Sequence, residues 1–306
     1  SGFTNSLKFS CTTADTSIAS NESFGIAQHI EAGTCARTGT GTSGAKQITF
    51  SFYAKADSTK TYVVQLLNNK HSSYIHNNRT FTVTSSWQRF TMTFQADTTA
   101  DSEFDGTLTD AGFSLSFYLH AGSDFTSATL ASDWATGTTN RAAGTQSFFS
   151  ATSNTFFVTG CQLEIGGTAT DFEHRSFADN LQACQRYYQK VGRDFSDTTP
   201  TTAFGWGYTT STSAAEGMFR FEKRMRAAPT FTQSTDQNLD FQTNTGSGAV
   251  HSSNAFTSVV LSEMSAEFTQ QNHASNFGGA GQPYFLKWNG VQGTGLSASI
   301  QLDAEL

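Results

Sequence analysis

The residues with the clearest chemical potential in this sequence are aromatic rings that stand beside polar side chains. Trp134 lies in a stretch without a strand pattern, so nothing in the local sequence would bury its ring. Asp133, Asn140 and Arg141 supply polar groups close to it in the chain. A stacked sugar requires an exposed ring with hydrogen-bonding groups beside it, so these four residues predict a glycan contact. The alternative is that Trp134 packs into a neighbouring subunit, because protein interfaces also select tryptophan.

A second aromatic pair is defined by its spacing. Trp206 and Tyr208 are separated by Gly207 alone, in a run of residues that is typical of a β-strand. Side chains two positions apart on a strand point to the same side, so both rings would lie on one face of a sheet. We predict that Trp206 and Tyr208 also contact a glycan.

A short acidic run is similar to the first half of a calcium-binding loop. Asp101, Glu103 and Asp105 stand at alternate positions, and Gly106 occupies the sixth position, where such loops turn sharply. The glutamate expected at the twelfth position is missing, since Gly112 stands there. Two interpretations stay open: a structural calcium ion held by the three carboxylates, or a plain acidic turn. No other cofactor is predicted.

Catalytic signatures are absent from the sequence. It contains no zinc-protease, nucleophile-elbow or phosphate-loop motif, and its seven histidines are scattered. Glycoside cleavage needs two carboxylates about 5–10 Å apart in a groove. Glu164, Asp171 and Glu173 cluster in the sequence, but they flank a turn and are interpreted as turn and capping carboxylates. The sequence therefore predicts no catalytic residues.

Composition favours an all-β protein. The chain has 306 residues with 28 phenylalanines, and 14% are charged, below the roughly 25% of typical domains. One helical pattern stands out among many short alternating segments. A net charge of −7 argues against a nucleic-acid partner, and the sequence lacks the run of about 18 apolar residues that membrane insertion needs. The chain begins with Ser-Gly rather than Met, so we expect a processed or excerpted chain that an attachment domain could precede.

Alternating apolar residues predict about eight strands in the first 175 residues, which suggests a two-sheet jelly roll. The clearest strand patterns begin near Ile48, Tyr62, Phe90 and Phe113. The stretch from Asp124 to Ser153 has little periodicity and is predicted to be a long functional or partner-facing loop. We expect a jelly-roll-like domain over residues 1–175, a connecting helix over 176–192 and a second antiparallel β-sandwich over 193–306.

A glycine shifts the alternation in the last strand of the first domain. Phe156 and Val158 share one parity, whereas Cys161 and Leu163 share the other, with Gly160 between the two pairs. A glycine at such a phase change indicates a β-bulge, in which the chain carries one extra residue and bends.

The single helical pattern follows this strand. Ser176 can cap a helix, with Asp179 three residues later, and Gly192 stands where the helix would end. Apolar residues recur at steps of four, three and four residues and form one stripe: Phe177, Leu181, Cys184 and Tyr188. Because this spacing suits helices that meet around an axis, we predict that the stripe drives oligomerisation, as a homotrimer.

Three groups of segments carry a resemblance to known families. The first group resembles a segment of bacteriophage virion proteins, especially marine ones: Gln162–Gly166, Ala169–Glu173 and Cys184–Tyr188. The second resembles jelly-roll carbohydrate-binding modules: Phe50–Lys55 and Ser86–Phe90, where Trp87 would be a core residue. The third is similar to the C-terminal domain of phage tail or fibre proteins: Met225–Thr230 and Leu302–Leu306. The resemblance implies a virion component with a sugar-binding-like fold.

This resemblance leads to the functional prediction. We expect a non-enzymatic outer tail-fibre or spike component that sits on the virion surface with other virion proteins and presents loops to host-surface glycans. One alternative is a capsid decoration or knob protein that stabilises the particle, and a further one is a polysaccharide depolymerase. Phage proteins assemble in a reducing bacterial cytoplasm, so the four cysteines are predicted to be free and buried, although a Cys11–Cys35 bridge is conceivable.

Overall fold

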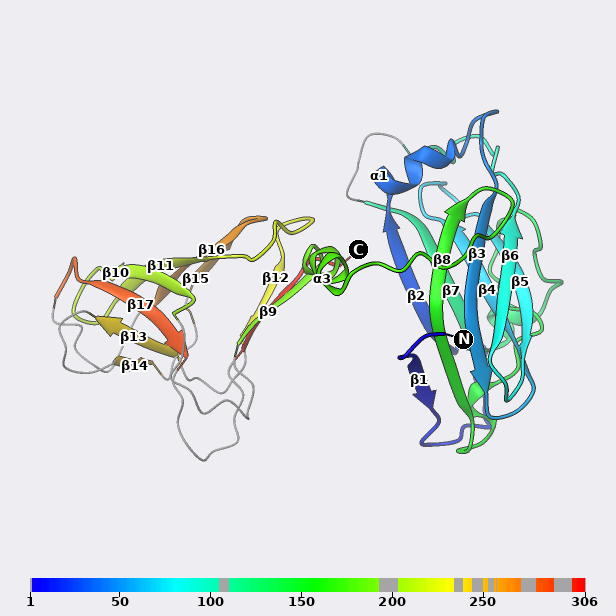
Figure 1. Ribbon diagram of the computed structural model, residues 1–306, viewed down its shortest axis with the longest axis horizontal. Coiled ribbons are helices and arrows are strands. Elements are labelled where there is room, and N and C mark those ends of the chain that lie inside the picture. The colour runs from blue at the N-terminus through cyan, green and yellow to red at the C-terminus, as the bar shows by residue number, and fades with distance from the viewer. Residues whose placement is uncertain are drawn as a thin grey trace. The chain divides into compact units, whose positions relative to one another are not determined.

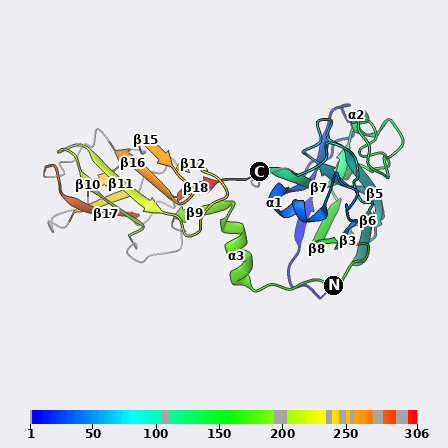
Figure 2. The same cartoon turned by 90° about the horizontal axis from the view of Figure 1, so that it is seen from above.

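The computed structural model of the chain is built almost entirely from antiparallel strands, which confirms the predicted all-β class (Figures 1 and 2). The chain folds as two compact units, Ser1–His174 and Arg175–Glu305. The described residues are 2–104, 110–192, 203–233, 239–243, 250–252, 256, 258–270, 279–288 and 299–305.

The first unit is a sandwich of two four-stranded sheets, as the alternation predicts. One sheet has the order β1-β8-β3-β6, formed by Leu7–Ser10, Thr155–Ile165, Ile48–Ala56 and Gln88–Phe94. The other has the order β2-β7-β4-β5, formed by Ser23–Glu31, Ala111–Ala121, Lys60–Asn68 and His76–Val83. All the pairings are antiparallel.

Phenylalanine rings fill the space between these two sheets. Phe52 on β3 is fully buried and meets Phe117 on β7 edge to face, with ring centroids 4.9 Å apart. Phe81 on β5 packs against the same Phe52 ring at 5.1 Å. Burial of each such side chain contributes about 1.5–3 kcal/mol, so these rings hold the sheets together.

The bulge predicted at Gly160 is confirmed. In the pairing of β3 with β8, Ser51 stands opposite Gln162 but Tyr53 stands opposite Thr159, so β8 carries an extra residue at this point. Gly160 has a φ angle of 59°, which a glycine adopts without strain. A Cβ atom there would lie 2.4 Å from the ring of Phe3, so the space is also taken.

The stretch from Asp124 to Ser153 contains little regular structure. It begins within helix α2, Ser123–Thr126, and includes one 3-10 helix, Phe148–Ser150. Two further short helical turns, Ala32–Cys35 (α1) and Ala36–Thr38, follow β2. The unpatterned sequence therefore corresponds to an irregular segment, which backbone hydrogen bonds tie to β5, as between His76 and Ala135.

The predicted helix is present but shorter than expected. Helix α3, Phe177–Gln185, begins at Ser176, whose hydroxyl accepts a hydrogen bond from the Asp179 N–H at 3.1 Å. The expected continuation to residue 192 is wrong, because β9, Tyr188–Gly192, leaves the helix and pairs with β18. The Gln189 side chain donates to the Gln185 carbonyl at 2.9 Å and so caps the helix end.

The second unit has a three-stranded and a seven-stranded sheet. The smaller has the order β12-β18-β9, in which β12 is Thr230–Gln233 and β18 is Ser299–Asp303. Pro229 directly precedes β12, which lies at an edge of this sheet, where a residue without a backbone N–H is tolerated. The larger has the order β14-β13-β17-β10-β11-β16-β15, formed by Val250–Ser252, Leu239–Thr243, Pro283–Trp288, Gly205–Thr209, Ala215–Arg220, Ser265–Gln270 and Ser258–Leu261.

Apolar residues of both sheets form the core of the second unit. Phe219 on β11, Phe268 on β16 and Leu286 on β17 are buried together with Ile300 and Leu302 on β18. One face of the seven-stranded sheet is therefore turned toward the smaller sheet. Alternate residues on the same strands must point the other way.

Candidate functional site

The outward face of the seven-stranded sheet exposes large aromatic rings. Along β10, Gly205, Gly207 and Thr209 are buried, whereas Trp206 is 61% and Tyr208 is 50% exposed. The prediction that Trp206 and Tyr208 share one face of a strand is confirmed. Neighbouring exposed rings form an apolar surface of the kind that is common at interaction sites.

Residues on the neighbouring strands extend this face. Trp206 stands opposite Met218 on β11 and opposite Phe285 on β17, which is 56% exposed. Tyr208 stands opposite Glu216. We call this surface the aromatic platform, defined by Trp206, Tyr208, Glu216, Met218, Ser258, Val260, Glu267, Thr269 and Phe285.

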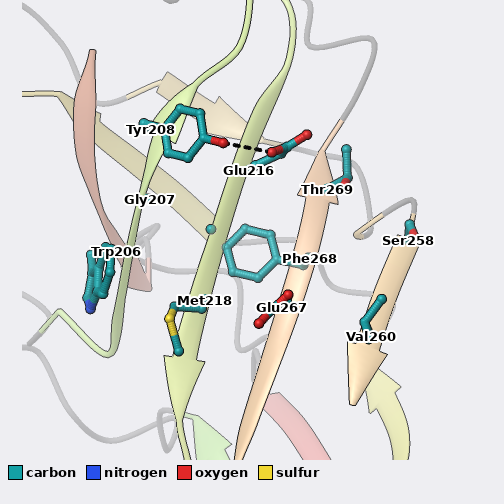
Figure 3. A pocket seen from close by; sticks show the side chains of 11 residues that line it. Trp206, Gly207, Tyr208, Glu216, Met218, Ser258, Val260, Glu267, Phe268 and Thr269 are labelled. Atoms are coloured by element: carbon teal, nitrogen blue, oxygen red, sulfur yellow. Dashed lines mark hydrogen bonds between the residues drawn. The ribbon is translucent and has the colours of Figure 1, made fainter. Parts of the chain in front are cut away.

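A shallow hollow of about 290 Å³ lies in the platform, and Figure 3 shows the side chains that line it. This volume is near the lower end of the usual size for small-molecule sites. Its floor includes Gly207, Gly217 and the buried Phe268. A Cβ atom on Gly217 would lie 2.7 Å from the Phe268 ring, so the two glycines leave room for side chains beneath the strands.

Polar groups stand beside the rings. The Tyr208 hydroxyl donates a hydrogen bond to the Glu216 carboxylate at 2.9 Å, and this bond raises the pKa of Tyr208 (Figure 3). Glu267 is exposed, and no other residue in the described part of the chain forms a hydrogen bond or ion pair with its side chain. The platform therefore offers aromatic faces together with carboxylate oxygens that can accept hydrogen bonds.

Trp134 occupies a different environment from the one predicted. Its ring lies nearly parallel to that of the buried Phe113, with centroids 6.1 Å apart, and packs against the core of the first unit. Its indole N–H donates to the Gln95 carbonyl at 2.8 Å. The prediction of a freely exposed ring is wrong, because the protein already uses one face and the polar group of Trp134 to close the end of the sandwich.

The polar residues near Trp134 also make internal contacts. Asp133 accepts a hydrogen bond from the Trp134 backbone N–H at 2.8 Å. Asn140 donates to the Thr136 carbonyl at 3.2 Å, and Arg141 donates to the Gln65 side chain at 2.9 Å. These bonds shape the irregular segment, so Asp133, Asn140 and Arg141 are not gathered around a free aromatic ring.

The acidic run of the first unit gives no completed metal site within the described residues. Asp101 and Glu103 are exposed, and Asp105 lies outside the described part of the chain. Among the residues that the structure describes, no three His, Cys, Asp or Glu side chains are grouped so that they could hold a metal ion. The calcium ion stays a prediction.

The apolar stripe is exposed, as an interface would require. Phe177 is 81% and Leu181 is 44% exposed, and Cys184 is also at the surface of α3. Tyr188 does not continue the helical stripe, because it lies on β9 opposite Asp303. Self-association through this stripe stays a prediction.

Two further expectations concern the cysteines and Trp87. The predicted burial of all four cysteines is half right: Cys11 and Cys35 are buried, whereas Cys161 and Cys184 are exposed, and all are free. Trp87 is not a core residue but half-buried on the outer surface, where the Lys55 ammonium lies 5.4 Å from its ring centroid.

Glu164 behaves as a turn carboxylate, as interpreted from the sequence. It accepts a hydrogen bond from the Thr170 backbone N–H at 3.1 Å. Burial by itself raises the pKa of Glu164, but hydrogen bonds from Thr170 and Gln162 outweigh it and hold this pKa below the ordinary value. An acid catalyst needs the opposite shift.

Several residues of the platform escape sequence reasoning. Glu216, Met218, Glu267 and Phe285 come from three separate strands, β11, β16 and β17, and no motif connects them. The usable signal is weak: each stands at an outward-facing position within an alternating segment.

None of the described helices is long and apolar enough to cross a membrane.

Comparisons with known proteins give distant likenesses. No protein-family profile matches the chain, and no curated protein matches it. A solved structure described as "CBM4 structure and function" is similar over 47% of this chain, with 19% identity and a TM-score of 0.25, and the chain spans 60% of that structure's length. The tandem CBM22 domain from Paenibacillus barcinonensis is similar over 98% of this chain and 95% of its own, with 8% identity and a TM-score of 0.22. Likenesses this low assign no family.

Proposed function

We propose that this chain is a non-enzymatic glycan-binding protein and that the aromatic platform is its contact surface. One observation carries the proposal: Trp206, Tyr208 and Phe285 are large rings that the fold holds at the surface of a sheet, beside carboxylate oxygens. A rigid sheet presents these rings without the entropy cost that a mobile loop would add.

Sugars suit such a surface because their rings have an apolar face and a hydroxyl rim. The apolar face can stack on Trp206 or Tyr208, and the hydroxyl groups can donate to Glu216 or Glu267. A site of this size gives a dissociation constant of about micromolar to millimolar. Several copies on one particle would raise the effective affinity by roughly 10²–10⁴ where their spacing matches the glycan.

The biological setting that we propose is an outer tail-fibre or spike component of a bacteriophage, assembled as a homotrimer. Its support is the sequence resemblance together with the exposed residues Phe177 and Leu181 on α3, which suit contacts with other copies. The same exposed helix also fits a capsid decoration protein, the alternative assignment.

A second candidate, a polysaccharide depolymerase, is favoured by one observation. Glu216 and Glu267 stand diagonally on neighbouring strands of an aromatic face, a pair that the sequence did not reveal. Both carboxylates are exposed, whereas a general acid of this kind is usually buried against apolar groups. We therefore favour binding over cleavage.

The test is glycan binding by single-residue variants of the full chain. Trp206→Ala should weaken binding of the protein to host surface polysaccharide at least about tenfold, because a stacking face is lost. Tyr74→Ala is the matched control, since Tyr74 is a similarly exposed aromatic residue in the first unit, 58% against 61% for Trp206. This control should bind normally.

Two results would overturn the proposal. Unchanged binding by Trp206→Ala would show that the platform is not the contact surface. Release of reducing ends from the polysaccharide, abolished by Glu216→Gln or Glu267→Gln, would replace binding with the depolymerase assignment. Melting temperatures of all variants must stay near that of the wild type for either comparison to count.

A further inference from the structure

The charges around the hollow have one sign. Its lining contains two carboxylates, Glu216 and Glu267, and among the described lining residues none is basic. Glu216 is hydrogen-bonded to a neutral hydroxyl, that of Tyr208, so this contact leaves its charge uncompensated. A ligand in the hollow therefore lies close to two negative charges.

The basic side chains of Arg220 and Arg224 lie outside the hollow. Arg220 is the next outward position of β11 after Met218, and it stands opposite Ser265 rather than beside the rings. Arg224 forms an ion pair with Glu263 at 2.5 Å. Neither arginine lines the hollow, so neither neutralises Glu216 and Glu267 there.

We propose that the platform selects uncharged or amino-bearing glycans and rejects acidic ones. The inference rests on the proposed glycan-binding function and specifies its ligand class. A uronate or sulfate group stacked on Trp206 or Tyr208 would bring a like charge within a few ångströms of Glu216 or Glu267. At such a separation in water, one like-charge contact weakens binding roughly fivefold, and two contacts weaken it by more than tenfold.

The outer face of the first unit carries the opposite charge and serves as an internal comparison. Lys8 and Lys55 both lie over the ring of Phe157, at 5.5 and 4.8 Å from its centroid, and Lys55 also lies over Trp87. Neither lysine forms an ion pair within the described residues. Acidic polymers have a competing place to bind here, so the test must isolate the component that depends on Trp206.

The experiment measures binding of the full chain to three probes at low salt: a cello-oligosaccharide, a chitosan oligosaccharide and an oligogalacturonide. We expect the first two to bind in a Trp206-dependent manner and the third at least about tenfold more weakly. Glu267→Gln should weaken chitosan binding more than cello-oligosaccharide binding, because glutamine keeps an oxygen that accepts from a hydroxyl group but loses the charge that attracts an ammonium group. Glu267→Lys should raise oligogalacturonide binding, and Lys55→Gln should not change any Trp206-dependent signal.

The outcomes separate this inference from the proposed function. Oligogalacturonide binding that equals cello-oligosaccharide binding and disappears in Trp206→Ala would overturn the charge selection and leave glycan binding at the platform intact. Indifference of all three probes to Glu267→Lys would also overturn it. Absence of binding to every probe would count against the proposed function itself, and the inference would fall with it.

Discussion

The outward faces of two sheets, one in each unit, differ in exposure: one is covered by other parts of the chain, and the other is open to solvent. In the first unit, Val63 and Gln65 on β4 point away from the core between the two sheets. They are nevertheless only 0% and 1% exposed. The irregular segment after α2 covers Gln65, as the Arg141–Gln65 hydrogen bond shows. In the second unit, Trp206 and Tyr208 on the seven-stranded sheet stay exposed.

Because of this difference, polar side chains stabilise the fold on the covered face and are available to a ligand on the exposed face. The covered face contains buried polar groups that bind one another: Gln65 donates to Asn78 at 3.0 Å, and Asn78 donates to the Ala131 carbonyl at 2.9 Å. Buried polar groups are costly unless they are paired, so these bonds hold the segment in place. The platform keeps its rings and carboxylates toward solvent, where a ligand can reach them.

The largest expected difference in stability between the two faces is that between replacing Trp134 and replacing Trp206. Trp134→Ala should lower the free energy of unfolding of the first unit by about 3 kcal/mol, because a ring packed against the core is lost. Trp206→Ala should change stability by less than about 0.5 kcal/mol, as exposed substitutions do. Calorimetry of the full chain measures both, with an expected shift of roughly 6–12 °C for Trp134→Ala. Equal shifts would contradict the assignment of the two roles.

A smaller effect concerns pH and His76 beneath the irregular segment. Its ring is buried and contacts the Gly137 carbonyl at 2.9 Å and the Asn78 amide at 2.9 Å. Burial, and to a lesser degree the positive charge of Arg141, lowers the pKa of His76. Because the folded pKa lies below the unfolded value of about 6.5, stability from neutral His76 is complete above that pH and is lost as pH falls below it.

Melting curves between pH 7.5 and about 5 check this expectation. The transition of the first unit should move to lower temperature as the solution is acidified, and His76→Gln should flatten that dependence. His71→Gln, in the preceding turn, is the control and should retain the slope. If the dependence of melting temperature on pH is unchanged in His76→Gln, His76 does not cause it.

The smallest effect on stability is expected at α3. Leu181→Asp should alter the melting temperature little, because Leu181 is 44% exposed, but it should lower the molar mass by preventing self-association. Leu7→Asp is a matched control in the first unit, where Leu7 is 46% exposed. Light scattering after size exclusion measures the mass. A wild-type chain that is already monomeric would end the homotrimer proposal.

Local patterns in the sequence determined much of the strand framework. Alternation predicts that Phe113 and Phe117 point into the core and that Trp206 and Tyr208 share a face, since successive side chains of a strand point to opposite sides. The Ser176 cap and the Gly160 bulge are equally local, because each depends on a few adjacent residues.

Tertiary structure alone decided the environments that depend on distant partners. Trp134 has no periodic neighbours, so its burial follows from Phe113 and Gln95, which reach it only in the folded sandwich. Tyr188 fits a helical stripe, yet pairing with β18 more than a hundred residues later makes it part of a strand. Glu216, Glu267 and Phe285 join Trp206 through the order of strands in one sheet, and strand order is a non-local property that residue spacing does not encode.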